Sequence, residues 1–265
     1  MKKIALLLLT APLALALAAC GGGSSPQVQA DPLAYVKHAA SKTAGTFSEH
    51  MSMTATISAA GQNVSMTGTG DYVNNPPRSN ISMSLSLMGH KISVDGVQQG
   101  TVIYMSSPLL KKELPTGKTW MKLDLAKYGK SAGINYQSLM SRSPAQALQQ
   151  VEAAGSVKSI GTETIDGVAT THYQVTNIDI SKLPQGAKLQ SLGDVKYGPI
   201  DVWVGNKDGY IYRESMSFTY AVSGQSASMS SQLDLSKFGE KVNVKVPPAS
   251  EVFDATSLAS GGLGA

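Results

Sequence analysis

The sequence contains little of what catalytic and disulfide-rich proteins depend on. It has one cysteine, Cys20, and four widely separated histidines, His38, His50, His90 and His172. A single cysteine cannot form a disulfide within the chain, and the histidines lack the spacing of metal ligands. No Gly-x-Ser-x-Gly elbow, phosphate loop or dinucleotide fingerprint occurs. We therefore expect no enzyme activity, no catalytic residues, no metal and no cofactor.

Charge is also sparse, since Asp, Glu, Lys and Arg make up 15% of the residues. The 22 Lys and Arg residues are nearly balanced by 18 Asp and Glu residues, and they form no run of the kind that follows nucleic-acid phosphates. This pattern excludes a nucleic-acid partner. Asp201 and Asp208 could be taken for a carboxylate pair, but one begins a predicted strand and the other belongs to a turn, so we interpret both as structural. His172 is interpreted in the same way.

The only long apolar run stands at the start of the chain. Lys2 and Lys3 precede an apolar segment, Ile4 to Ala19. This segment is too short to remain as a stable membrane span, and the order of charge and apolar run is typical of a secretory signal peptide. We therefore assign residues 1–19 to a signal peptide.

The end of that segment resembles a bacterial lipobox, because the small residues of Leu17-Ala18-Ala19 come directly before Cys20. The resemblance implies that a diacylglyceryl group, of the palmitate type, is attached to Cys20, which then becomes the mature N-terminus. Two acyl chains suffice for stable anchoring. The prediction is a protein held by lipid on the extracytoplasmic face of the cell membrane; an ordinary signal peptide with an incidental cysteine is the alternative.

The rest of the chain divides by composition. Residues 20–31, which are small and polar and are interrupted by Pro26, predict a flexible tether, and residues 256–265 predict a disordered tail. Between them, residues 32–255 are long enough for one domain with a sizeable core.

Alternation of apolar and polar residues predicts most of this domain to be strand. The pattern predicts three helices and predicts that the segment 181–194 leaves the sheet. Strands, helices and strands in this order predict an α+β fold built on an antiparallel meander. The predicted strands are 47–57, 64–72, 81–87, 91–94, 100–105, 119–123, 157–165, 169–178, 198–204, 210–222 and 226–235, with an extended piece at 242–246; the predicted helices are 32–40, 134–140 and 144–154.

Methionine is frequent in these predicted strands. A face built from flexible, polarisable methionine side chains can adapt to acyl chains of varied shape, and lipid sites require a mostly apolar lining. Ordinary core packing is the alternative for each residue taken singly. The candidate ligand-binding residues are Met51, Met53, Met66, Met83, Leu85, Met105, Met216, Phe218 and Met229.

Short motifs recur through the second half of the chain. They are Asp166-Gly167-Val168, Thr171-His172-Tyr173, Asp201-Val202-Trp203-Val204, Asp208-Gly209, Leu233-Asp234-Leu235, Phe238-Gly239 and Val246-Pro247-Pro248. Their order, together with the lipobox, resembles the actinobacterial LppX/LprG lipoprotein family. The resemblance implies a LolA/LolB-like fold, a curved antiparallel half-barrel covered by a few helices around a hydrophobic cavity. It also implies that the cavity binds lipids or lipoglycans for transport toward the cell envelope.

The expected partners are therefore an acylated lipid or lipoglycan, the plasma membrane and a membrane transporter. The segments 134–154 and 181–194 are candidates for a lid over the cavity. Two other functions stay open at this point: an envelope sensor that binds lipid or a partner protein, and a structural lipoprotein whose barrel is packed solid. Cavity volume would distinguish a carrier from a solid barrel.

Overall fold

The computed structural model describes the larger part of the predicted domain, namely residues 31–59, 61–87, 89–127, 155–178, 196–222 and 225–256. Several predictions concern residues outside this part. They are the signal peptide, Cys20 with the tether up to residue 30, the helices 134–140 and 144–154, the segment 181–194, and the tail beyond residue 256.

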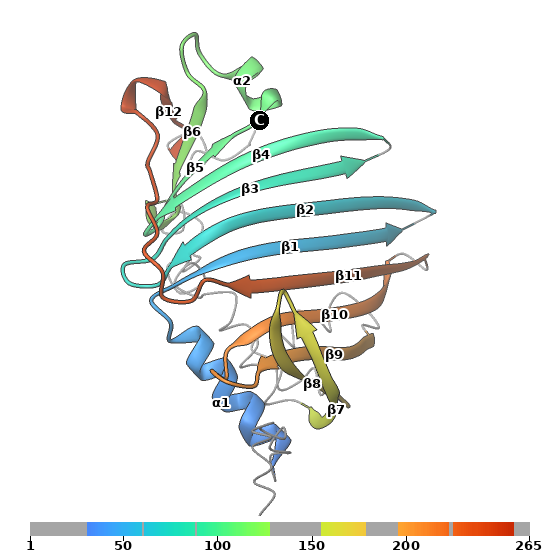
Figure 1. Ribbon diagram of the computed structural model, residues 1–265. Helices are drawn as coiled ribbons and strands as arrows, with labels where there is room; N and C mark the ends of the chain where they lie inside the picture. Colours follow the sequence, from blue (N-terminus) through green and yellow to red (C-terminus); the bar gives the residue numbers. More distant parts are fainter. Residues whose placement is uncertain are drawn as a thin grey trace, which may run out of the picture.

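The described residues form one curved, open sheet of twelve strands with few helices, which confirms the predicted α+β class (Figure 1). The strand order is β12-β6-β5-β4-β3-β2-β1-β11-β10-β9-β8-β7. The strands are β1 (Ser48–Ala59), β2 (Gln62–Val73), β3 (Arg78–Leu87), β4 (His90–Gln99), β5 (Val102–Ser106), β6 (Trp120–Asp124), β7 (Ser156–Ile165), β8 (Val168–Thr176), β9 (Lys196–Gly205), β10 (Ile211–Val222), β11 (Gln225–Ser236) and β12 (Val252–Asp254).

Two antiparallel meanders make up the sheet, and the predicted strands lie within them. The first meander runs from β1 to β6 and the second from β7 to β11. They join where β1 pairs with β11, with Met53 opposite Leu233. Alternation within each strand could not reveal this pairing, because β1 and β11 stand far apart in the sequence.

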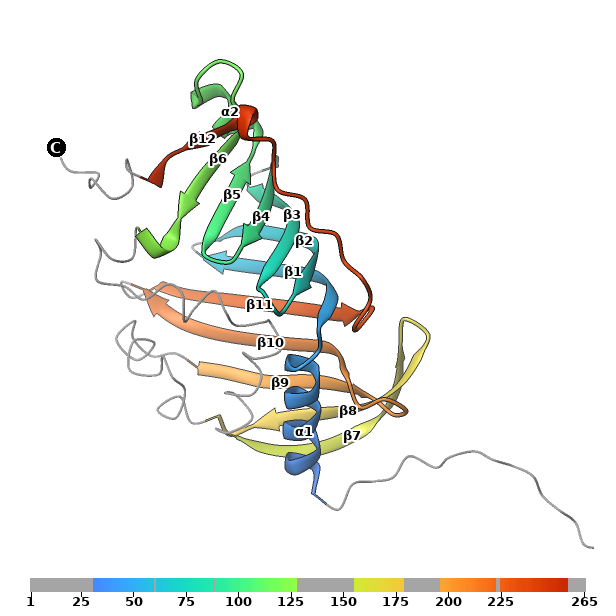
Figure 2. The ribbon, with the colours of Figure 1, turned by 90° about the vertical axis from the view of Figure 1, so that its left-hand side faces the viewer.

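The C-terminal end of the sheet differs from the prediction. The expected extended piece 242–246 is not a strand. It belongs to a long coil that carries the chain from the end of β11 to the far side of the sheet (Figure 2). There the short β12 pairs with β6 in parallel, so the sheet is not antiparallel throughout as predicted.

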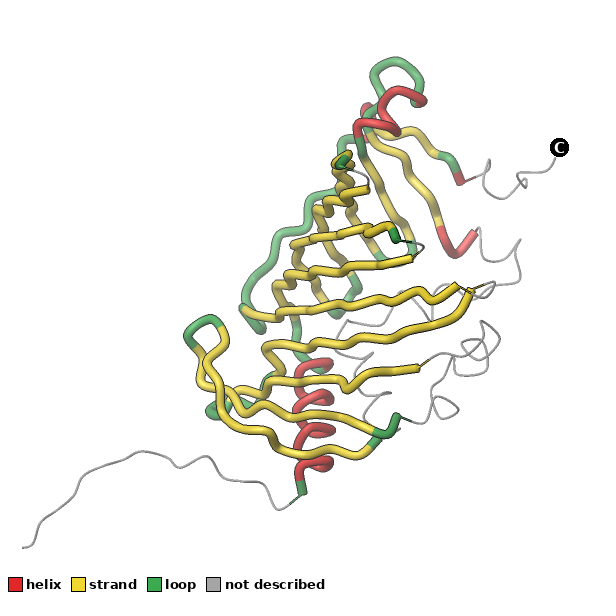
Figure 3. Tube along the Cα trace, turned by 90° about the vertical axis from the view of Figure 1, so that its right-hand side faces the viewer, coloured by secondary structure: helices red, strands yellow, loops and turns green. Residues whose placement is uncertain are grey.

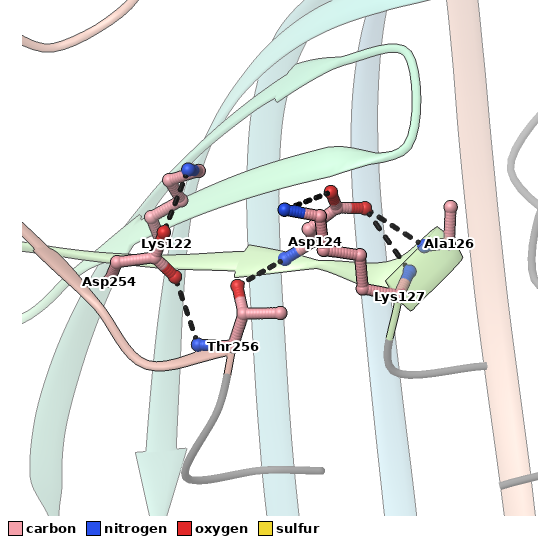
Figure 4. Close-up of polar contacts among 6 residues, drawn as sticks. All are labelled: Lys122, Asp124, Ala126, Lys127, Asp254 and Thr256. Carbon is pink, nitrogen blue, oxygen red and sulfur yellow. Dashed lines mark hydrogen bonds and ion pairs between the residues drawn. The ribbon is translucent and has the colours of Figure 1, made fainter. Parts of the chain in front are cut away.

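Side chains fasten β12 to β6 (Figure 4). The Lys122 ammonium lies 2.8 Å from the Asp254 carboxylate, and the backbone N–H of Asp124 donates to the Thr256 hydroxyl at 3.0 Å. The hydrogen bond from Lys122, together with those from Thr256, holds the pKa of Asp254 well below its usual range. These contacts compensate for the small number of backbone bonds that a three-residue strand can form.

The first helix, α1 (Pro32–Ala44), is longer than predicted. Its N-terminus is capped by Asp31, whose side chain accepts a hydrogen bond from Ala34 N at 3.1 Å, and the helix ends at Gly45. Its apolar side packs across β8, β9 and β10 (Figure 2). The buried residues of this contact are Val36, Ala39, Ala40, Tyr173, Val175, Ile200, Val202, Val204 and Ile211.

One polar side chain connects α1 directly to the sheet. The buried Thr43 hydroxyl donates to the carbonyl of Ala39 at 2.8 Å and accepts from the backbone N–H of Ile211 at 2.9 Å. Both bonds lie in the core, where an unpaired backbone N–H would be costly. A second helix, α2 (Pro108–Glu113), was not predicted; it begins at a Ser107 cap followed by Pro108, a recognisable start signal.

Candidate functional site

The register of the strands brings all nine candidate residues onto one face of the sheet, which we call the apolar face. Across β1, β2 and β3, Met53 lies opposite Gly68, and Gly68 lies opposite Met83. Met66 and Leu85 are paired in the same way. The other five are placed by alternation and by the pairs Met51–Leu235, Gly96–Met105, Met216–Ser231 and Phe218–Met229.

The opposite face is polar. Along β1 it carries Ser52, Thr54 and Thr56, and similar hydroxyl side chains follow on β2, β3 and β11. A shallow depression of about 220 Å³ lies on this polar side. Its lining residues are Thr54, Ala55, Thr56, Ser215, Ser230, Ser231 and Gln232. Such a surface does not suit an acyl chain, so the predicted cavity over the apolar face stays a prediction.

The apolar face is buried to different degrees along the sheet. Where α1 covers it, Ile200, Val202 and Val204 have no exposed surface. From β10 to β5 in the strand order, by contrast, eight of the nine candidate residues are only half-buried, and Met51 alone among the nine is buried. Figure 3 shows α1 at one end of the row of strands and α2 at the other. A contiguous, partly exposed apolar surface of this kind marks a binding site more often than a core.

Two glycines on the apolar face are covered by side chains from neighbouring strands. The Cγ atoms of Met53 and Met83 lie 3.1 and 3.2 Å from the position that a Cβ atom would take on Gly68. A Cβ on Gly96 would lie 3.0 Å from Ile81. Side chains from neighbouring strands thus lie over positions that have no side chain. At Gly68 these side chains are methionines, whose flexibility lets the surface change shape.

Several apolar members of this face were not among the candidates. All of them are half-buried. The emphasis on methionine left out the Ile, Val and Leu residues, although the same alternation shows them, and Met121 was left out because its strand is too short to show a clear pattern. The residues are Ile57, Val64, Ile81, Ile92, Val94, Met121 and Leu233.

Two carboxyl groups on the apolar face were also missed. Glu49 is 1% exposed and Glu214 is 5% exposed. Burial away from water raises the pKa of Glu49 to about 7 and that of Glu214 to about 8. Both interrupt the alternation at positions where an apolar residue is expected, and this signal could have revealed them.

Glu49 has a close polar neighbour in Tyr72, which lies opposite it in the β1–β2 pair. Neither oxygen of the Glu49 carboxyl nor the Tyr72 hydroxyl has a hydrogen-bond partner within the described part of the chain. Burial, with a smaller contribution from the charge of Glu49, raises the pKa of Tyr72. Each unpaired buried polar group costs about 1–3 kcal/mol.

His172 lies on the polar face, where it links three strands. Its Nδ1 atom is 3.0 Å from the Glu163 carboxylate, and its Nε2 atom is 2.8 Å from Asp201. The ring stacks on Trp203 at 4.3 Å, and Trp203 donates to Glu163. Asp208 instead accepts from the Tyr212 hydroxyl, so the two aspartates considered above have different partners. The arrangement around His172 fastens β7, β8 and β9 together.

Among the residues that the structure describes, no group of three His, Cys, Asp or Glu side chains could hold a metal ion. Within the same residues, no helix is both long and apolar enough to cross a membrane.

Comparison with known proteins gives similarities of modest extent. No family model matches the sequence. A 153-residue stretch is 27% identical to an uncharacterised 31.2 kDa protein of Streptomyces griseus from the rplA-rplJ intergenic region. The match covers 52% of this chain and 48% of that protein, so the chain spans about half the length of this relative.

Among solved structures, the lipoprotein LppX of Mycobacterium tuberculosis is similar over 80% of this chain and 97% of its own, at 20% identity and a TM-score of 0.49. LprF of Mycobacterium bovis is similar over 82% and 96%, at 15% identity and the same TM-score. At this level of identity, function has to be inferred from the residues of this chain.

Proposed function

We propose that this protein is an envelope lipoprotein that binds the acyl chains of a lipid or lipoglycan on its apolar face and carries them toward the cell envelope. A lipid on Cys20 would hold it at the extracytoplasmic side of the plasma membrane. The observation that carries the proposal is that the nine predicted residues, which come from six strands, lie on one face of the sheet, where eight of them are half-buried.

The energetics support an apolar ligand. Removing apolar surface from water contributes about 25 cal/mol per Å². A protein with no ligand would gain stability by packing this region as tightly as the region under α1, where the side chains are fully buried. Half-burial of Met53, Met66 and Met83 is therefore a cost in the free protein, and an acyl chain laid along the face would remove it.

The polar head of the ligand would remain in water, because the face carries few groups able to replace its hydration. A membrane transporter that supplies or receives the lipid, and a lid formed by the segments 134–154 and 181–194, belong to the same proposal. The chemistry proposed is transfer of an intact molecule, with no bond formed or broken.

Native mass spectrometry of the mature chain carrying Cys20→Ser, purified from a related bacterium, tests the proposal. A diacyl or triacyl lipid bound near one-to-one, released by organic extraction, is the expected result. A protein that arrives empty and takes up no offered lipid would favour a structural or partner-binding lipoprotein. A bound lipid that never passes to acceptor vesicles would favour a lipid sensor.

A further inference from the structure

Two polar side chains interrupt the apolar face at one end of β1 and β2. Glu49 is the second residue of β1, and Tyr72 is the second-last residue of β2. The next residues on this face are Met51 and Gly70, followed by Met53 and Gly68. Two residues along a strand advance about 6.6 Å. The Glu49–Tyr72 pair thus lies about 13 Å along β1 from Met53, within the length of an acyl chain that contacts both.

The pair combines deep burial with unused hydrogen-bonding groups. Glu49 and Tyr72 are 1% and 5% exposed, and their three side-chain oxygens have no partner among the described residues. The surrounding cluster is apolar: Ala44, Met51 and Leu235 are buried there, and Ile81, Leu233 and Phe238 pack against it. Apolar residues at positions 49 and 72 would be more stable in such surroundings.

We propose that Glu49 and Tyr72 form a hydrogen-bonding subsite for an oxygen atom carried on the acyl chain of the bound lipid, either a hydroxyl or an ester oxygen. This inference rests on the proposed function and narrows the ligand class. A face lined only by apolar side chains would bind plain and oxygenated chains by length and shape alone. With this subsite, the apolar face favours chains that bear oxygen.

The chemistry of the two groups suits such an atom. Burial raises the pKa of Glu49 to about 7, so the neutral carboxyl, which donates one hydrogen bond and accepts others, is substantially populated at neutral pH. The Tyr72 hydroxyl also donates and accepts. A ligand hydroxyl can bond to both, and an ester oxygen can accept from either. Met51, flexible and next to Glu49 on the same strand, can move aside to admit a chain.

Affinity measurements with matched fatty acids test the subsite. Stearate and hydroxystearates that differ in the position of the hydroxyl group are titrated into the delipidated mature chain carrying Cys20→Ser. One buried hydrogen bond predicts that the best-placed hydroxystearate binds about three- to tenfold more tightly than stearate. In Tyr72→Phe and Glu49→Met this preference should disappear while stearate still binds, and Glu49→Gln, which keeps a neutral donor and acceptor, should retain it.

Tyr104→Phe is the matched control, since Tyr104 lies on the other face of β5, next in the chain to Met105. Tyr72→Phe removes one hydroxyl and keeps the ring, so it tests the subsite even if Glu49→Met does not fold. Equal affinity for all the fatty acids, or a preference that survives both substitutions, would overturn the subsite and leave acyl-chain binding intact. Failure to bind any of them would overturn the proposed function itself.

Discussion

Met53 on β1 and Met83 on β3 both lie over Gly68, the residue between them on β2. Their Cγ atoms are 3.1 and 3.2 Å from where a Cβ atom of residue 68 would be, so methionine side chains cover bare backbone at this point. This arrangement makes the shape of the apolar face depend on a position that contributes no side chain.

Replacing Gly68 by leucine should displace both methionines. We expect a loss of stability of about 1–3 kcal/mol from overpacking and weaker binding of a fluorescent fatty acid. Thr67→Leu places the same side chain on the adjacent residue, which faces the polar side. Denaturant titration and fluorescence titration of both variants check this; equal binding by the two would mean that the surface at Gly68 does not contact the ligand.

A charge on the apolar face should affect binding more than folding. Met53 is half-buried, so a lysine there can extend its ammonium group toward water while its charge remains beside the bound chain. We expect Met53→Lys to lower fatty-acid affinity at least tenfold. Thr54→Lys, one residue along β1 on the exposed polar face, is the control. If Met53→Lys loses stability and binding in equal measure, Met53 is a core residue.

Glu214 should make the stability of the protein depend on pH. It lies opposite Leu233 and Val202, and its pKa is about 8 in the folded chain against 4.5 for the group in water. The folded state therefore holds a proton that the unfolded state has released. The unfolding free energy should fall as pH rises between these values, by about 1.4 kcal/mol per pH unit at most.

Glu214→Gln should flatten this profile and stabilise the protein at pH values near 8, as measured by urea denaturation across the range. Glu49 contributes in the same direction over a narrower window that ends near its pKa of about 7. The control is Glu113→Gln, an exposed position at the end of α2. A profile that rises with pH in the wild-type protein and in Glu214→Gln alike would show that Glu214 is not held neutral by burial.

Removing the hydroxyl of Thr43 should loosen α1 from the sheet. Thr43→Val keeps the shape but leaves the buried N–H of Ile211 without its acceptor, which should cost about 1–3 kcal/mol. Thr43→Ser retains the acceptor and should recover most of the loss relative to Thr43→Val. Thermal denaturation monitored by circular dichroism separates the two variants. If Thr43→Ser melts at or below the temperature of Thr43→Val, packing of the methyl group matters at least as much as the hydrogen bond to Ile211.

Cys20 should determine where the protein resides. In Cys20→Ala the thiol that would carry the lipid is gone, so the protein should leave the membrane fraction and no longer incorporate labelled palmitate. Ser24→Ala, in the same predicted tether, should change neither property. Retention of Cys20→Ala in the membrane after salt washing would show that another feature anchors the chain.

The sequence predicts those features of the fold and of the candidate site that depend on residues close together in the chain. Alternation along a strand is a local property, and for that reason the strands around Met51, Met66, Met83, Met216 and Met229 could be placed and assigned to a face before any partner was known. Most of the long antiparallel strands were predicted within a few residues, but the prediction 91–94 covers less than half of β4 (His90–Gln99). The three-residue β12 was not predicted, because a strand so short has no alternation to recognise.

Pairing between distant strands was decided by tertiary structure. The sequence indicates that Met53 and Leu233 each belong to an apolar strand face, but only the β1–β11 register places them opposite one another and merges two meanders into a single surface. No local pattern in the residues between Met53 and Leu233 predicts the β1–β11 register.

The sequence by itself determined the fold class, the polarity of the two sheet faces and the lipobox-like cysteine, because each depends on residues close together in the chain. Only the tertiary structure decided which part of the apolar face α1 buries and which part stays half-exposed. It also decided that Glu49 and Tyr72 are buried away from water with no hydrogen-bond partner among the described residues. Burial depends on what packs against a residue from elsewhere in the chain, and that property is absent from any local pattern.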